Sequence, residues 1–154
     1  MTAIPTTLSG TELAVVTRGL CKRYGSQIAL QDVDLQVPAG AVYLLVGPNG
    51  AGKSTTLKVL LDLTRADRGS AEVFGLDVQR LGPQVRANVG YVPERTDWGY
   101  GWMPVGRLLH YHAQYYPTWD QAYATHLAAA FQLKLDRPLS TLSKGQARRV
   151  HLAM

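Results

Sequence analysis

The protein has 154 residues, of which 46% are hydrophobic and 18% charged, and a formal net charge of +5. This composition is typical of one globular domain and excludes a disordered chain. The lone cysteine, Cys21, excludes an internal disulfide, and no apolar run approaches the ~20 residues of a membrane span. The positive charge suits anionic ligands, but the longest basic run is Arg148–Arg149, so nucleic-acid binding is not expected.

Strand-forming residues dominate the first part of the chain, after a polar segment at 1–12 that is expected to be loose. Aliphatic and β-branched residues predict strands at 13–20, 28–37, 41–46, 70–75 and 89–94. The third of these, AVYLLV, is continuously apolar, which is typical of a strand buried on both faces of a parallel sheet.

Helical spacing begins at Lys53 and returns after residue 104. Helices are predicted at 53–63, 105–116, 118–133 and 143–154. Asp62 is interpreted as a solvated charge near the end of the first helix, and Ser143 as the N-cap of the last. The expected domains are a strand-rich core at 13–94, a helical subdomain at 95–142 and the start of a further helix at 143–154.

A glycine-rich loop, GPNGAGKS at 47–54, lies between the predicted strand 41–46 and the helix that follows it. The pattern G-x-x-x-x-G-K-[ST] in this setting indicates a cradle of backbone N–H groups for phosphate anions. In such a cradle Lys53 reaches the β- and γ-phosphates, and the Ser54 hydroxyl coordinates Mg²⁺. We call residues 47–55 the phosphate loop, and we expect a nucleotide to contact Gly47, Pro48, Asn49, Gly50, Ala51, Gly52, Lys53, Ser54 and Thr55.

Tyr24 follows the first predicted strand and has two interpretations. Taken alone, a tyrosine in a turn more often covers the core. Beside a phosphate loop, its flat ring could instead stack on the base of a nucleotide.

The order Tyr24, GPNGAGKST, VGYVPE, LSKGQ resembles the nucleotide-binding domain of ATP-binding cassette (ABC) transporters, from about residue 13 to the C-terminus. The segment YYPTWD and the variant LSKGQARR are similar to ATPase subunits of bacterial ABC-2-type exporters. The resemblance implies an α/β fold: a P-loop NTPase core with an antiparallel β subdomain and a helical (signature) subdomain, the C-terminal part of the core being missing. It also implies that Tyr24 stacks on adenine.

The resemblance assigns roles to two further places. Glu94 occupies the Q-loop position, where the family usually has a Gln that touches Mg²⁺ and the attacking water, so Lys53 and Glu94 are the expected catalytic residues. The signature motif is matched by Ser143, Lys144, Gly145 and Gln146.

The signature residues are expected to act on another subunit. Two domains of the family meet head to tail, so that Ser143 faces the γ-phosphate held by the partner's phosphate loop. An ordinary capped helix would explain Ser143 but not Gly145, since glycine costs ~1 kcal/mol in a helix. Lys144 departs from the family's glycine, and it either adds a cation beside the phosphate or points to solvent.

The function implied is an ATP-binding subunit on the cytoplasmic face of the membrane. Mg²⁺ and ATP drive dimerisation with a second nucleotide-binding domain, and hydrolysis powers export through a transmembrane permease. The chain stops before the family's Walker B strand, catalytic Glu and switch His, so a truncated product with little turnover of its own is expected. The alternatives are a non-hydrolysing nucleotide-binding module and a soluble ABC-type protein acting on nucleic acid or the ribosome.

Three aromatic residues follow Glu94 and are interleaved with glycines: Trp98, Tyr100 and Trp102. They are either anchors for a transmembrane partner or fillers between the core and the helical part. Both interpretations stay open.

Overall fold

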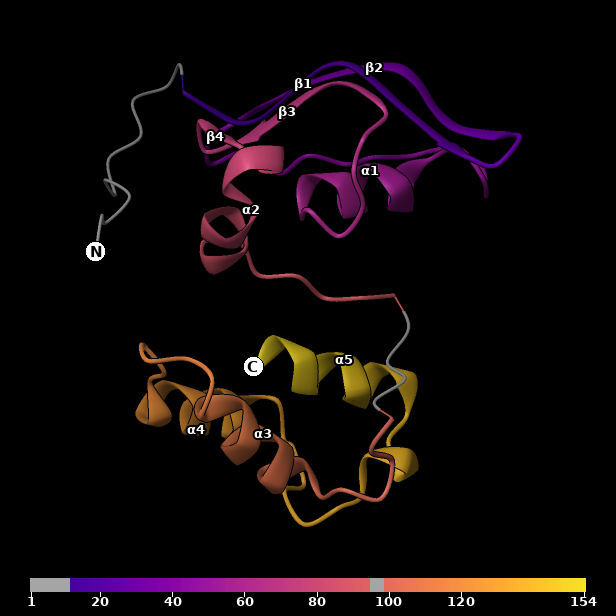
Figure 1. The fold of residues 1–154 in the computed structure, drawn as a ribbon. Coiled ribbons are helices and arrows are strands. Elements are labelled where there is room, and N and C mark those ends of the chain that lie inside the picture. The colour runs from indigo at the N-terminus through magenta and orange to yellow at the C-terminus, as the bar shows by residue number, and fades with distance from the viewer. Residues whose placement is uncertain (1–11, 95–98) are drawn as a thin grey trace. The chain divides into compact units, whose positions relative to one another are not determined.

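The computed structural model describes residues 12–94 and 99–154. Contacts between residues divide the chain into two compact units, Met1–Gly90 and Tyr91–Met154 (Figure 1). The expectation of a loose N-terminal segment and the two interpretations of Trp98 fall outside the described residues.

The first unit contains, in order, β1 (Leu13–Tyr24), β2 (Gln27–Pro38), α1 (Lys53–Leu60), β3 (Arg68–Val73), β4 (Leu76–Asp77) and α2 (Val78–Ala87). The second contains α3 (Val105–Ala113), α4 (Gln121–Ala130), a 3-10 turn (Leu139–Thr141) and α5 (Lys144–Leu152).

The strands form an antiparallel sheet in the order β2-β1-β3-β4. The strands predicted at 13–20 and 28–37 are confirmed, and the first extends to Tyr24. The strand predicted at 70–75 is present as β3, which begins two residues earlier and ends at Val73, before the turn at Gly75. Only two residues separate β1 from β2, and Tyr24 pairs with Gln27 across the hairpin. Tyr24 is therefore the last residue of a strand, held in place by the ladder of the sheet.

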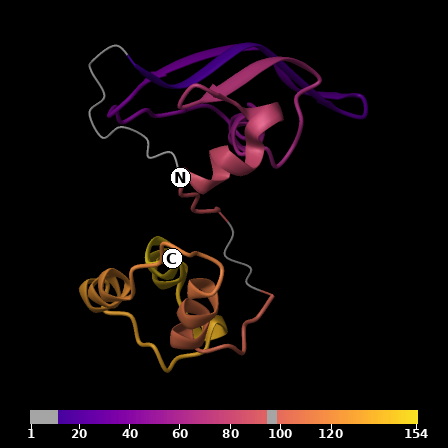
Figure 2. The ribbon, with the colours of Figure 1, turned by 60° about the vertical axis from the view of Figure 1, so that its left-hand side comes forward.

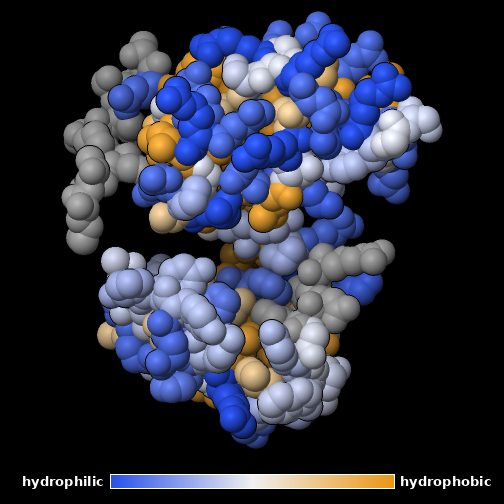
Figure 3. All heavy atoms as spheres, in the orientation of Figure 1, coloured by the Kyte–Doolittle hydropathy of each residue, from blue (hydrophilic) through white to orange (hydrophobic). Residues whose placement is uncertain are grey.

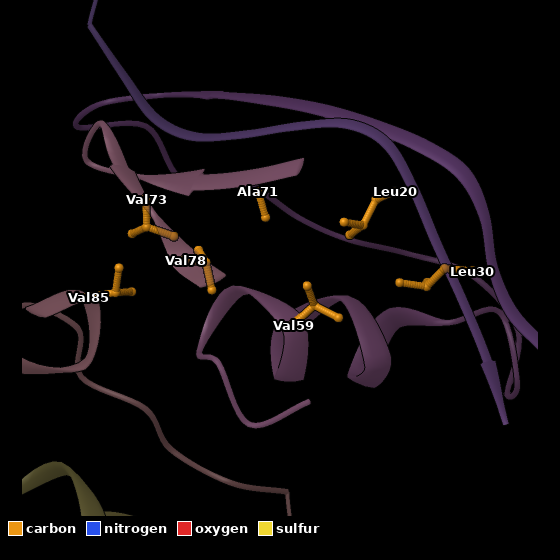
Figure 4. Close-up of a cluster of buried hydrophobic side chains, with 7 residues drawn as sticks. All are labelled: Leu20, Leu30, Val59, Ala71, Val73, Val78 and Val85. Atoms are coloured by element: carbon orange, nitrogen blue, oxygen red, sulfur yellow. The ribbon is translucent and has the colours of Figure 1, made fainter. Parts of the chain in front are cut away.

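The core of the first unit lies between one face of the sheet and the helices α1 and α2, which Figures 1 and 2 show on the same side. It consists of the buried side chains of Leu20, Leu30, Val59, Ala71, Val73, Val78 and Val85 (Figure 4). Burying a Val or Leu side chain contributes about 1.5–3 kcal/mol, so this cluster fixes α1 against the sheet. Hydrophilic residues cover most of the face of this unit drawn in the upper part of Figure 3.

The predictions of strands at 41–46 and 89–94 were wrong. Both segments are irregular, and among the described residues no strand pairs with either of them. The side chains of Val42, Leu44 and Val46 are exposed rather than buried. An apolar run favours burial, but a strand also needs neighbours for its backbone N–H and C=O groups, and the observed sheet provides none for these segments.

The end of α1 also differs from the prediction, because the helix stops at Leu60 and not at residue 63. Asp62 has a positive φ of 53° and lies in the turn that follows. Its carboxylate accepts a hydrogen bond from Arg86 of α2 at 3.0 Å. Asp62 is therefore an ion-paired residue that links two helices, and not a solvated helix-end charge.

The second unit is helical, as the spacing of its apolar residues predicts. Its core contains Met103, Val105, Leu108, Leu109, Leu139, Val150 and Ala153, which come from α3, the 3-10 turn and α5 and from residues next to them. Backbone hydrogen bonds tie the entry of α3 to the segment before the 3-10 turn: Val105 N–H donates to Arg137 and Gly106 N–H to Leu135. This packing holds the N-terminus of α5 in a defined position within the unit.

Candidate functional site

The phosphate loop joins the irregular segment 41–46 to α1, and glycines at two positions fix its path. Gly50 and Gly52 both have a φ of +86°, in the left-handed region that other residues rarely adopt. A Cβ on Gly52 would lie 2.5 Å from the carbonyl oxygen of Ala29 and 2.6 Å from Cδ2 of Leu30. The loop therefore packs directly on β2, and no side chain fits at Gly52.

The ammonium group of Lys53 lies inside this loop. Its Nζ donates to the carbonyl oxygens of Gly47 at 2.7 Å and of Pro48 at 2.8 Å. Behind it, the Thr56 side chain is buried and donates to the Gly52 carbonyl at 3.1 Å. Ser54, on the first turn of α1, is exposed. The loop thus presents a cation, a helix N-terminus and an exposed hydroxyl together, which is the chemistry that a phosphate group requires.

Tyr24 lies on β1, which pairs with β2, and the phosphate loop packs on β2. Lys22 pairs with Leu30 in the β1–β2 register, and Leu30 contacts the backbone at Gly52. Tyr24 is two residues farther along β1, which is about 7 Å at the usual rise of a strand. Tyr24 is 47% exposed, so the residue does not simply cover the core.

Glu94 and the signature residues lie in the second unit, whereas the phosphate loop lies in the first. Glu94 is exposed and comes directly before residues 95–98. Tyr24, Lys53 and Ser54 belong to the first unit, and Glu94 and Ser143 belong to the second. Their shared role stays a prediction.

The signature residues form the first turn of α5 and are held by a capping box. Ser143 Oγ accepts from the Gln146 N–H at 3.2 Å, and Gln146 Oε1 accepts from the Ser143 N–H at 2.9 Å. Lys144 and Gly145 are exposed, and a Cβ added to Gly145 would meet nothing within 4 Å. Packing against the described residues of the second unit therefore does not explain why position 145 is glycine.

Asp67 is a residue near Tyr24 that the sequence pattern missed. Its carboxylate accepts from Lys22 Nζ at 2.9 Å and from the Arg23 N–H at 2.6 Å. These two bonds, the one from Lys22 first, hold the pKa of Asp67 below its usual value, against a small opposing effect of burial. The local sequence ADRG contains no signal for this role, because both partners lie more than 40 residues earlier in the chain.

The described part of the chain contains neither a cluster of metal-ligating side chains nor a membrane-spanning helix. No group of three or more His, Cys, Asp or Glu side chains in residues 12–94 and 99–154 is arranged to hold a metal ion. An Mg²⁺ ion bound by one hydroxyl together with substrate phosphates and water needs no such group. Within the same residues, none of the helices has the length and apolar character needed to cross a bilayer.

Comparison with known proteins identifies the family. A family model described as ABC transporter matches residues 30–154. The chain belongs to the ABC transporter family. The resemblance stated from Tyr24, the phosphate loop and LSKGQ is thereby confirmed.

Relatives of this ABC transporter chain are named for different transport roles. It is 39% identical over 150 residues to the daunorubicin/doxorubicin resistance ATP-binding protein DrrA of Streptomyces peucetius, covering 91% of this chain and 44% of that protein. It is 34% identical over 159 residues to the zinc transport system ATP-binding protein TroB of Treponema pallidum, covering 95% and 57%. The chain thus spans about half the length of the curated relatives it matches.

A solved structure confirms the predicted fold class. The structure titled as the ATP binding subunit of an ABC transporter superposes with a TM-score of 0.77 at 27% identity, covering 91% of this chain and 60% of that one. The antiparallel sheet and the helices of this ABC transporter chain therefore form part of the α/β fold of the family's ATP-binding subunits.

Proposed function

We propose that this chain binds Mg²⁺-ATP through the phosphate loop and serves as the ATP-binding part of an export transporter. The observation that carries this proposal is the position of Lys53, whose ammonium group lies among the loop carbonyls at the N-terminus of α1. In this proposal a bound phosphate replaces those carbonyls as the partner of Lys53. Gly52, which packs on β2 with no room for a side chain, supports the same close approach of backbone and phosphate.

Each of the expected site residues has its own task in this proposal. Tyr24 provides a half-exposed ring for adenine, and the backbone of residues 47–52 surrounds the phosphates. Lys53 places a positive charge where negative charge increases during phosphoryl transfer. Ser54, and Glu94 from the second unit, would hold Mg²⁺, which when bound neutralises charge on the β- and γ-phosphates.

The signature residues would complete the site of a second domain, in a head-to-tail dimer. The Ser143 Oγ already accepts a hydrogen bond from Gln146, and its hydroxyl proton remains able to donate to a phosphate oxygen. The open space around Gly145 supports the close approach of a partner, and the exposed Lys144 adds a cation beside it. Gln146 already caps the helix through its side chain, so we assign it the task of fixing Ser143.

For the whole protein, the proposal also includes ATP hydrolysis, a transmembrane permease partner and a position on the cytoplasmic face of the membrane. The export direction is supported by the relative from Streptomyces peucetius, whose name assigns it to drug resistance. The relative from Treponema pallidum is also named as an ATP-binding protein, but its name, zinc transport system, gives no direction of transport. The proposal of export therefore rests on the relative from Streptomyces peucetius.

The binding step is tested by titration calorimetry of the chain with Mg²⁺-ATP. Lys53→Ala should weaken binding at least about tenfold, because a hydrogen bond to a charged group is typically worth about 1.5–3 kcal/mol. Lys58→Ala is the matched control, since Lys58 is an exposed lysine on the last turn of the same helix, and it should change affinity less than about twofold. Equal affinities for the Lys53 variant and the unaltered chain would rule the proposal out.

A further inference from the structure

Asp67 lies in the segment between α1 and β3, and it contacts three consecutive residues of β1. Its Oδ1 accepts from Lys22 Nζ at 2.9 Å, and its Oδ2 accepts from the Arg23 N–H at 2.6 Å. Its own N–H donates to the Cys21 carbonyl at 2.9 Å. One residue therefore fixes both the backbone and a side chain directly before Tyr24.

Lys22 links Asp67 to the ring of Tyr24, because its ammonium group contacts both. Its Nζ lies over the ring of Tyr24, 5.4 Å from the centroid, and only 14% of its side chain is exposed. A cation in this position is attracted to the face of the ring and holds it. An aromatic ring has two faces, so the face opposite Lys22 is the one that a base can use.

We infer that Asp67 is a positioning residue for the Tyr24 ring, and that the Asp67–Lys22 pair sets how tightly the base of a bound nucleotide is held. The inference rests on the proposed function, in which Tyr24 stacks on adenine. It assigns to this pair no contact with the phosphates, which lie at the phosphate loop.

Three substitutions separate this role from a general effect on stability. Asp67→Asn keeps the shape of the side chain but removes the charge that holds Lys22, and Lys22→Gln breaks the same contact from the other side. Glu72→Gln is the matched control, because it breaks an exposed ion pair of the same sheet, Arg18–Glu72 at 3.1 Å. A melting curve of each variant reports whether it is folded.

The probes are Mg²⁺-ATP and inorganic tripolyphosphate, which has the phosphates but no base. Asp67→Asn and Lys22→Gln should each weaken ATP binding at least about two- to fivefold, which corresponds to the weaker end of the range for cation–π contacts. Neither should change the affinity for tripolyphosphate, and Glu72→Gln should change neither affinity. In a Tyr24→Ala background, Asp67→Asn should have no further effect on ATP.

The outcomes distinguish the inference from the proposed function. If Asp67→Asn and Lys22→Gln weaken both probes equally, or if Asp67→Asn weakens ATP equally without the Tyr24 ring, then Asp67 supports the fold and the inference is wrong while ATP binding stands. If the unaltered chain binds neither probe, the proposed function fails and the inference fails with it. Selective loss of ATP affinity that depends on Tyr24 supports both.

Discussion

Arg86 of α2 donates a hydrogen bond to the Asp62 carboxylate at 3.0 Å, in the turn that ends α1. Gly82 packs against the same carboxylate so closely that an added Cβ would overlap it. The link therefore depends on two features at once, an ion pair and a missing side chain, and it fixes α2 to the helix that carries Lys53.

The first prediction concerns this link. Gly82→Ala should destabilise the chain by about 1–3 kcal/mol, because the new methyl group displaces Asp62 in a packed site. In an Asp62→Gly background the same change should cost little, since the carboxylate and the Cβ that the new methyl group would overlap are both gone. Urea unfolding of the four proteins measures both values, and an equal cost in the two backgrounds would contradict this account.

The second prediction compares two glycines of the phosphate loop that share a φ of +86°. Gly50→Ala should cost about 1–2 kcal/mol for the left-handed backbone alone, since an added Cβ there meets nothing within 4 Å. Gly52→Ala should cost more, because its Cβ also collides with Ala29 and Leu30 of β2. Denaturant unfolding gives both costs. Similar values for the two variants would mean that the loop does not pack on β2.

The third prediction concerns the capping box of α5. Ser143→Ala should reduce the stability of the second unit by about 0.5–2 kcal/mol, through loss of the bond to Gln146 N–H. The double variant Ser143→Ala/Gln146→Ala should lose less stability than the sum of the losses of the two single variants, because both residues belong to one pair of hydrogen bonds. Asp120→Ala, which removes the cap of α4, is the control and should be additive with Ser143→Ala. Strict additivity in both combinations would show that the box is not formed.

The fourth prediction separates stability from function at Gly145. Gly145→Ala should stabilise α5 by about 0.5–1 kcal/mol, because alanine is the better helix former and the added Cβ meets nothing. The same methyl group would occupy the surface that a partner's phosphate approaches, so ATP-dependent dimerisation should weaken. Thermal unfolding and sedimentation velocity measure the two effects. A more stable protein with undiminished dimerisation would remove the support that Gly145 gives to the shared site.

The fifth prediction is a loss of stability in the second unit as the pH falls below about 6.5, the ordinary pKa of histidine. Burial, and next the charge of His151, lowers the pKa of His112, and burial lowers the pKa of His151. The folded state therefore binds fewer protons than the unfolded state in this range, so unfolding is favoured by acid.

The measurement is the Tm of unfolding between pH 7.5 and pH 5.5. His112→Gln should flatten the pH dependence of Tm, whereas His126→Gln, at an exposed position of α4, should leave it unchanged. An identical pH dependence in the unaltered chain and the His112 variant would contradict the assignment.

The features that the sequence predicted correctly are determined by residues close together in the chain. The start of a helix at Lys53 and the N-cap at Ser143 follow from local backbone chemistry, so short patterns were enough. The segment 41–46 was wrong because a strand is defined by a partner elsewhere in the chain.

Two further features were missed for related reasons. No pattern indicated α2, because Gly82 and Pro83 read as helix breakers, and the chain instead accommodates them with a kink at Leu81. Asp67 was missed because its partners lie on a strand more than 40 residues earlier. Residues whose roles come from distant contacts cannot be found from spacing alone.

Lys53 and Ser143 lie in separate compact units, each with its own hydrophobic core. In the proposed head-to-tail dimer, a defect at one of them therefore leaves the other residue of the same chain intact. When a Lys53→Ala chain pairs with a Ser143→Ala chain, one composite site contains both lesions and the other contains neither. Two inactive alleles expressed together would restore a complete site, and this intragenic complementation is the genetic signature of a shared ATP site.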